Sequence, residues 1–195
     1  MKAVLISIQP KWCELIASGK KTVEVRKTKP KLETPFKVYI YCTLSGSNDF
    51  FKKNCNGDIA QWNKSKMAFK KGKVIGEFVC DKVDGIAHCG TCNSDIRLRL
   101  VDEKFYCKEL DYEYLNKCKL SYFDIDEYSN GGDVYGWHIS DLVIYDKPKE
   151  LSEFWQCNYE YDCCDCNYFN ELDEVCEKPI RPPQSWMYVE RLGEG

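Results

Sequence analysis

The chain has 195 residues, a length that suits one domain with a substantial core, so we expect a single domain over residues 1–195. It carries 28 Lys or Arg and 31 Asp or Glu, a formal net charge of −3. Long duplex DNA is bound through clustered basic residues, and this balance argues against that class of protein. No apolar run approaches the roughly 18 residues that span a bilayer, and none resembles a secretory leader. We therefore expect a cytoplasmic protein without membrane contact.

The charges are distributed unevenly along the chain. Residues 1–80 hold 16 Lys or Arg and 6 Asp or Glu, a net of +10, whereas residues 81–195 hold 12 and 25, a net of −13. A basic first half would attract a phosphate-bearing ligand, while the acidic remainder would limit indiscriminate binding. The alternative is that these lysines form only a solvated surface.

The first elements are predicted to be a strand followed by a short helix. Residues 3–8 are apolar and rich in β-formers, which is typical of a buried strand. Pro10 suits the first turn of a helix, Trp12, Leu15 and Ile16 follow at helical spacing, and Gly19 suits the C-terminal cap. The pattern predicts a helix from about residue 10 to residue 18, with Trp12 on its core face.

The remaining elements are mostly strands that helices do not separate regularly. Residues 22–26 alternate, with Val23 and Val25 on one face and Thr22, Glu24 and Arg26 on the other. Further strands are predicted at 36–42, 74–80, 137–145 and 186–190, with a polar, lysine-rich loop or helical segment over 45–71 and a helical stretch near 112–115. This order favours an α+β fold with a barrel-like sheet over a doubly wound parallel one.

The polar stretch from Gly19 to Arg26 has the pattern Gly-x-Lys-x-x-Glu-x-Arg. Glu24 and Arg26 share a strand face about 7 Å apart, and the long side chain of Lys21 can reach the same space. Arg26 can fork onto a phosphate or carboxylate, Glu24 can accept hydrogen bonds from a base edge or transfer a proton, and Lys21 can stabilise an anion. We predict that they line a nucleotide-sized cleft. The alternative is a surface ion pair that contributes about 0–1 kcal/mol.

The segment from Ser7 to Arg26, which holds this motif, resembles the ASCH family of the PUA-like superfamily. Segments 74–78, 135–142 and 181–186 are similar to parts of ASCH proteins from phages and bacteria. The resemblance implies a small β-barrel with flanking helices, and RNA or a modified nucleoside bound in a cleft beside the motif. No family pattern is recognised over residues 45–71, 81–118 and 157–180.

The resemblance also implies activities that this chain does not match completely. Some relatives are implied to be amidohydrolases that deacetylate N4-acetylcytidine with a Lys, a Thr and a distant Glu. Lys21 matches that lysine, but Glu24 stands where those enzymes carry the threonine, and Thr22 lies two residues earlier. Lys21 and Glu24 are the candidate catalytic residues. Another branch is implied to cut single-stranded RNA, and the phage-like resemblance keeps open a nucleotide-sequestering or protein-binding role.

Other residues are candidates for contacting the ligand. Aromatic rings can stack on bases, and polar side chains beside a proline-rich approach can read a base edge. The candidates, in addition to Arg26, are Thr22, Trp12, Trp137, His138, Gln184, Ser185 and Trp186. Structural alternatives are a core position for Trp12 and a satisfied structural role for His138.

Thirteen cysteines in a chain without an export signal favour buried free thiols, metal-bound thiolates, or both. Cys157, Cys163, Cys166 and Cys176 have the spacing of a structural Zn²⁺ site that would order a flap over about 157–180. A weaker candidate is the pair Cys89 and Cys92, beside His88, with Cys107 and Cys118 as possible partners. The alternative is reduced cysteines in a surface loop. We expect no organic cofactor.

Overall fold

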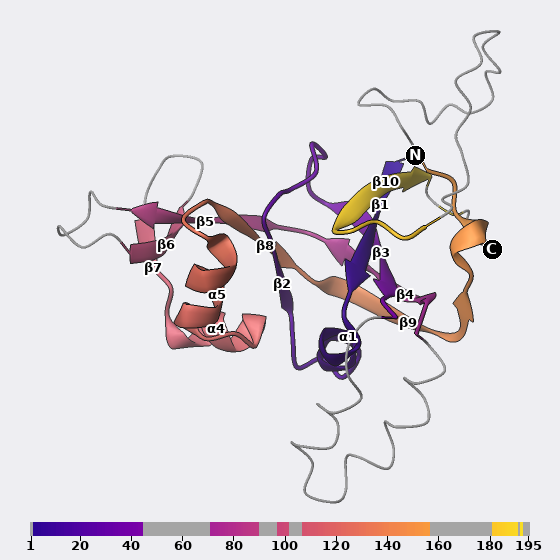
Figure 1. Ribbon diagram of the computed structural model, residues 1–195, viewed down its shortest axis with the longest axis horizontal. Coiled ribbons are helices and arrows are strands. Elements are labelled where there is room, and N and C mark those ends of the chain that lie inside the picture. Colours follow the sequence, from indigo (N-terminus) through magenta and orange to yellow (C-terminus); the bar gives the residue numbers. More distant parts are fainter. Residues whose placement is uncertain are drawn as a thin grey trace, which may run out of the picture. The chain divides into compact units, whose positions relative to one another are not determined.

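The computed structural model describes residues 2–44, 71–89, 97–101, 107–156, 181–190 and 192 (Figure 1). The chain forms two compact units, each built from separate stretches. The first unit is Met1–Ala17, Phe36–Phe78 and Leu142–Gly195, and the second is Ser18–Pro35 and Val79–Asp141. The polar segment 45–70 and the cysteine-rich segment 157–180 lie outside the described residues. That the two units make up one domain stays a prediction.

Most of the first sheet belongs to the first unit. Its order is β10-β1-β3-β4-β9, formed by β1 (Lys2–Ile8), β3 (Phe36–Cys42), β4 (Lys73–Cys80), β9 (Ser140–Lys149) and β10 (Trp186–Glu190). Strand β1 runs parallel to β3 and antiparallel to β10. β1 is apolar and almost wholly buried, as a strand between two neighbours must be. A core of apolar side chains lies against this sheet, including Leu5, Tyr39, Val74, Phe154 and Val189.

Helix α1 (Pro10–Ala17) lies within the predicted bounds, but its buried face differs from the predicted one. Pro10, Cys13 and Ile16 are buried, whereas Trp12 is only partly buried and has the Lys11 ammonium 4.4 Å from its ring centroid. The predicted core position of Trp12 is therefore wrong. The buried face of the helix is formed by Pro10, Cys13 and Ile16, which follow one another at intervals of three residues. Gly19 has a φ of +70°, the left-handed conformation expected of a residue that ends a helix. The single-turn helix η1 (Leu151–Glu153) follows β9.

The second unit contains a five-stranded sheet with two helices. Its order is β2-β8-β5-β6-β7, formed by β2 (Val23–Arg26), β8 (Val134–His138), β5 (Val83–Cys89), β6 (Arg97–Val101) and β7 (Cys107–Glu109). All of its ladders are antiparallel. Helices α4 (Tyr112–Cys118) and α5 (Tyr122–Ser129) lie beside this sheet in Figure 1. Their buried side chains form one core with apolar residues of β2, β5, β6 and β8.

Local capping explains where these two helices begin and end. Asp111 accepts a hydrogen bond from the Tyr114 amide at 2.8 Å, so it caps α4. Ser121 and Asp124 form a reciprocal capping box at the start of α5. Lys119 and Asn130 end the helices in the left-handed conformation. None of the described helices is long and apolar enough to cross a membrane.

The α+β class predicted from the sequence is confirmed, and so are strands β1, β2, β3, β4 and β10. The predicted strand over 137–145 is wrong, because the chain forms two strands there. β8 ends at His138, Ile139 is not in a strand, and Asp141 has a φ of +46°. The first of these strands joins the second unit's sheet and the other pairs in the first sheet.

Candidate functional site

The motif lysine is buried and bound to the end of a helix. Lys21 precedes β2 and is 2% exposed, and its Nζ donates a hydrogen bond to the backbone oxygen of Cys118 at 2.6 Å. Cys118 is the last residue of α4, where carbonyl groups lack partners within the helix and the helix dipole favours a cation. Lys21 is therefore positioned by α4 as well as by its own strand.

Glu24 lies between the two motif cations. One carboxylate oxygen, Oε2, is 3.3 Å from Lys21 Nζ, and the other, Oε1, is 3.0 Å from an Arg26 guanidinium nitrogen. Glu24 is 6% exposed and Arg26 is 9% exposed. These three side chains, hereafter the motif cluster, lie close together as predicted. The ion pairs of the structural alternative are present, but they are buried rather than at the surface. The cleft expected beside them stays a prediction.

Burial of the motif cluster is energetically demanding. Moving a charged group out of water costs several kcal/mol, and ion pairing recovers this cost only with good geometry. A buried ion pair is therefore weak evidence for a purely stabilising role. Two cations share one carboxylate, so the cluster itself carries a formal charge of +1. The positive charges therefore exceed the negative ones inside this buried cluster.

The ladder between β2 and β8 divides the predicted site residues between two faces of the sheet. Residues directly opposite each other in an antiparallel pair project to the same face. Glu24 lies opposite Trp137 and Arg26 opposite Tyr135, so these four share the face of the motif cluster. Trp137 is fully buried, and its ring presents no exposed surface on which a base could stack.

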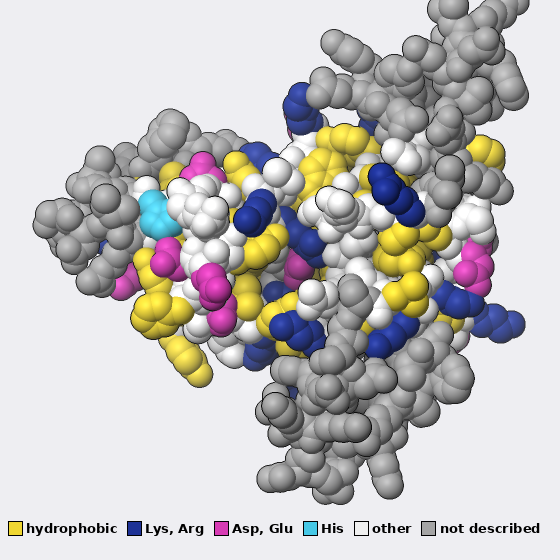
Figure 2. All heavy atoms as spheres, viewed as in Figure 1, with side chains coloured by type: hydrophobic (Ala, Val, Ile, Leu, Met, Phe, Trp, Pro, Cys, Tyr) yellow, Lys and Arg dark blue, Asp and Glu magenta, His cyan; other side chains and the backbone are white. Residues whose placement is uncertain are grey.

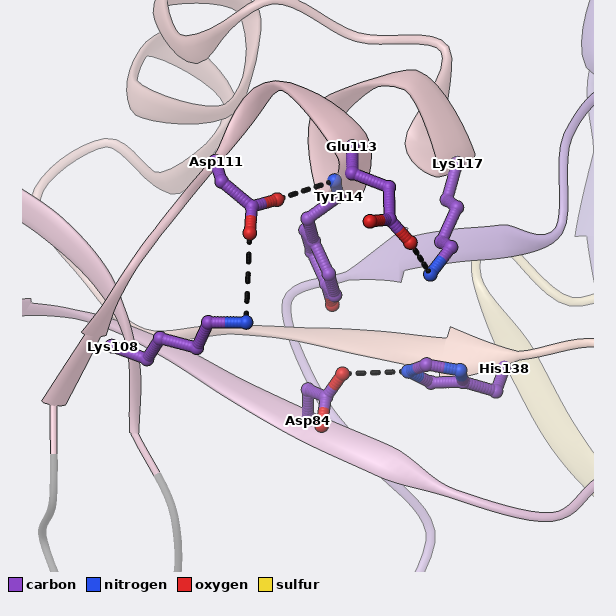
Figure 3. Close-up of polar contacts among 7 residues, drawn as sticks. All are labelled: Asp84, Lys108, Asp111, Glu113, Tyr114, Lys117 and His138. Carbon is purple, nitrogen blue, oxygen red and sulfur yellow. Dashed lines mark hydrogen bonds and ion pairs between the residues drawn. The ribbon is translucent and has the colours of Figure 1, made fainter.

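His138 belongs to the other face, and the structure does not place it in the motif cluster. It lies opposite Val23, whose side chain is in the core with α4 and α5. Its Nε2 is 2.6 Å from Asp84 Oδ2 on β5, as drawn in Figure 3. Burial by itself would raise the pKa of Asp84, but hydrogen bonds from His138 and Lys82 outweigh it and lower the pKa to about 2. Because an ionised carboxylate only accepts, His138 Nε2 is the donor.

Sequence reasoning missed Asp84 and Tyr114, which complete this second face. Tyr114 points from α4 toward Asp84 and His138 (Figure 3), and its ring centroid is 6.3 Å from that of His138. A Cβ built on Gly136 would lie 2.0 Å from the Tyr114 hydroxyl, so only glycine leaves room for it. Burial, together with nearby Cys118 and Asp84, raises the pKa of Tyr114. The available signal in the sequence was Gly136, which lies between two aromatic residues and indicates that another group approaches the backbone closely there.

Thr22 contributes backbone rather than side-chain contacts. Its amide donates to Lys117 O at 3.0 Å, and its carbonyl accepts from the Ile139 amide at 2.9 Å. The residue is exposed. These bonds join the start of β2 to the end of α4 and to the residue after β8, and so fix the position of the motif.

Four further candidates belong to the first unit. Trp12 is on α1, Gln184 and Ser185 directly precede β10, and Trp186 is its first residue. The Ser7 hydroxyl donates to Pro183 O at 2.6 Å, and the Ser7 amide donates to Ser185 O at 2.9 Å, so this segment is held beside β1. Gln184 is exposed, and Trp186 is partly buried with its ring edge-to-face on Tyr188. Their roles in ligand binding stay predictions.

The cysteine predictions are tested only in part. Cys157, Cys163, Cys166 and Cys176 lie outside the described residues, so the Zn²⁺ site stays a prediction. Within the described part of the chain, no three metal-binding side chains come together. Four of the described cysteines are buried free thiols, which agrees with the expectation of buried free thiols: Cys13, Cys42, Cys80 and Cys118. Burial raises the pKa of Cys118 to about 12, so it packs as a neutral thiol.

Comparison with known proteins agrees with this arrangement. The family profile described as the ASCH domain matches residues 6–135, which include the motif cluster. The chain belongs to the ASCH domain family. Comparison with curated proteins found no match. Two similar solved structures are a serine-to-alanine and a tyrosine-to-phenylalanine variant of ZmASCH from Zymomonas mobilis, each 17% identical with a TM-score of 0.51.

These alignments extend over most of both chains in each comparison. They cover 97% and 98% of this protein and 89% and 92% of the two ZmASCH chains. At this identity they bear on the fold alone, and they agree with the mixed α+β class that the sequence predicted.

Proposed function

We propose that this ASCH protein binds RNA or a modified nucleoside at the motif cluster. The observation that carries the proposal is the burial of Lys21 and Arg26 against the same Glu24 carboxylate, within the residues that match the family profile. The family resemblance implies this class of ligand.

The side chains of the cluster suit that ligand chemically. The Arg26 guanidinium can fork onto a phosphate, and the Glu24 carboxylate can accept hydrogen bonds from the amino group of a base. Lys21 adds a second positive charge while its ammonium remains attached to α4. Hydrogen bonds to charged groups typically contribute about 1.5–3 kcal/mol each, so a few of them account for useful affinity.

Hydrolysis of an amide on a modified cytidine is an alternative outcome at the same cluster. The threonine that the amidohydrolase resemblance implies is replaced by Glu24, which is already engaged by two cations. Binding without turnover is therefore the stronger proposal, and the same experiment separates the two.

The experiment measures binding and turnover together. Purified protein is titrated with a ten-nucleotide single-stranded RNA and with N4-acetylcytidine, and the solutions are then analysed for deacetylation and RNA cleavage. Arg26→Lys keeps the charge but loses the planar fork, and Glu24→Gln keeps the shape but loses the carboxylate. Each should weaken binding of the RNA, the nucleoside or both by roughly 10-fold to 100-fold.

Lys20→Ala is the matched control, because Lys20 is exposed and adjacent to the motif lysine. Urea unfolding of each variant separates lost binding from lost folding. The proposal fails if Arg26→Lys and Glu24→Gln are folded and bind both probes as tightly as the wild type. It also fails if the wild type binds neither probe.

A further inference from the structure

We infer that the ligand is a single-stranded RNA that continues from the motif cluster along a lysine–tyrosine track of Lys27, Lys29, Tyr128 and Tyr135. This inference rests on the proposed function and narrows it, because a free nucleoside is too small to use both sites. All four residues belong to the second unit, as the motif cluster does.

The first support is the charge of the segment that follows β2. Residues 26–31 contain Arg26, Lys27, Lys29 and Lys31 and no carboxylate. The three lysines are exposed, in contrast with the buried Arg26. A run of exposed cations beside a buried one offers successive phosphates a positively charged path.

The second support is that two of these lysines lie against tyrosine rings. Lys27 Nζ is 5.2 Å from the ring centroid of Tyr128 on α5, and Lys29 Nζ is 5.5 Å from that of Tyr135 on β8. Tyr128 is 39% exposed. Binding of single-stranded nucleic acid combines cations for the backbone with aromatic rings for the bases, and each pair supplies both.

The third support is the position of the track beside the motif cluster. Tyr135 lies directly opposite Arg26 in the ladder between β2 and β8, on the same face of the sheet. Tyr128 belongs to α5, which packs against the other face, so the RNA passes around β2, an edge strand among the described strands of this sheet. The backbone from Arg26 to Lys29 is continuous with β2, so the two sites are adjacent. On the face of the molecule drawn in Figure 2, Lys and Arg side chains lie among hydrophobic ones.

One neighbouring charge restricts how the strand lies. Glu127 is exposed and precedes Tyr128, so it repels a phosphate at that ring. The phosphates are therefore assigned to Lys27 and Lys29, and Tyr128 contacts only a base. Tyr135 contacts the base nearest the motif cluster.

The test compares RNA binding by track variants with charge-matched and ring-matched controls. Fluorescence anisotropy with a labelled ten-nucleotide single-stranded RNA is measured over a series of salt concentrations. The double variant Lys27→Ala with Lys29→Ala should bind more weakly, and its slope of log affinity against log salt should be about 1.4 less steep. Tyr135→Leu should weaken binding about 5-fold to 150-fold.

The controls keep the same change in composition outside the track. Lys108→Ala with Lys117→Ala also removes two positive charges from the second unit, but their ammonium groups are paired with Asp111 and Glu113. Tyr112→Leu removes an exposed tyrosine from α4. Neither control should alter the affinity by more than about twofold, and both should keep the wild-type salt slope.

The outcomes separate this inference from the proposed function. If the track variants bind the RNA like their controls while Arg26→Lys weakens binding, the track is wrong and the motif cluster stands. If N4-acetylcytidine competes fully for the site and a ten-nucleotide RNA binds no tighter than a trinucleotide, the track is also wrong. A wild type that binds no RNA overturns the track whatever it does with the nucleoside.

Discussion

The two faces of the ladder between β2 and β8 carry polar groups of different kinds. On one face, Glu24 joins Lys21 and Arg26 in a buried cluster with a formal charge of +1. On the other face, His138 and Asp84 form a partly exposed pair at the margin of an apolar core. The first arrangement is costly to bury and suits a ligand, whereas the second satisfies its own hydrogen bonds. The difference shows that nearness in sequence, as between Trp137 and His138, does not make residues share a site.

The largest expected effect comes from removing the carboxylate of the motif cluster. Glu24→Ala leaves Lys21 and Arg26 buried without it and should lower the free energy of unfolding by about 3–5 kcal/mol. Urea unfolding measures this, and Glu24→Gln should lose less. A loss of under 1 kcal/mol would mean that the cluster is hydrated in solution, and the contrast between the faces would disappear.

The next effect tests the packing on the opposite face. Gly136→Ala places a methyl group where the Tyr114 hydroxyl lies and should cost about 3 kcal/mol, the upper part of the usual range for overpacking. Tyr114→Phe in the same chain removes the clashing oxygen and should restore part of the stability. Thermal unfolding of the two single variants and the double variant gives the coupling. Additive losses would contradict the contact.

A smaller effect concerns the pH dependence of stability. The pKa of Asp84 is about 2 in the folded chain and 3.8 without the surrounding structure, so its contribution is present above about pH 4. It is lost as the pH falls toward 2, and amounts to about 2 kcal/mol. Unfolding at a series of pH values should therefore show a shallower acid loss for Asp84→Asn than for the wild type. Equal slopes would mean that the His138 contact does not hold the carboxylate.

The smallest effect provides a reference outside the motif cluster. Ser121→Ala removes the hydroxyl of the capping box at the start of α5 and should cost about 1 kcal/mol. Because Ser121 is exposed and distant in sequence from the motif, RNA binding should be unchanged. A binding loss here would show that α5 influences the track beyond Tyr128.

The elements that the sequence predicted well are those with strong local signals. The apolar run of β1, Pro10 and Gly19 around α1, and the alternation of β2 all depend on neighbouring residues. Helix α5 was not predicted, although Ser121 and Asp124 have the spacing of a capping box. The reason is that few apolar residues follow this pair in the sequence. β6 was missed although Arg97 to Val101 alternate, and β5 because Asp84 and Gly85 interrupt its apolar pattern.

The parts of the candidate site that come from one short segment were predicted. The parts that depend on contacts between distant segments were not. Glu24 and Arg26 are two residues apart on β2, so the strand period places them on one face, and Lys21, just before the strand, reaches the same carboxylate. The separation of His138 from them depends on where β8 pairs with β2, which is a long-range property. The contact of Lys21 with Cys118 and that of Tyr114 with Gly136 also join distant parts of the chain.

The attachment of Lys21 to Cys118 has a consequence for how binding would be sensed. One ammonium serves both the last carbonyl of α4 and the carboxylate of Glu24. A bound phosphate that attracts the Lys21 ammonium would weaken its hydrogen bond to the final turn of α4. Conversely, a strong hydrogen bond to α4 would lower the affinity of the cluster for the phosphate. If a phosphate binds at the cluster as proposed, occupancy of the cluster and integrity of the helix end are thermodynamically linked, with equal effects in both directions. Hydrogen exchange of the backbone amides at the end of α4 would therefore report on whether a ligand occupies the cluster.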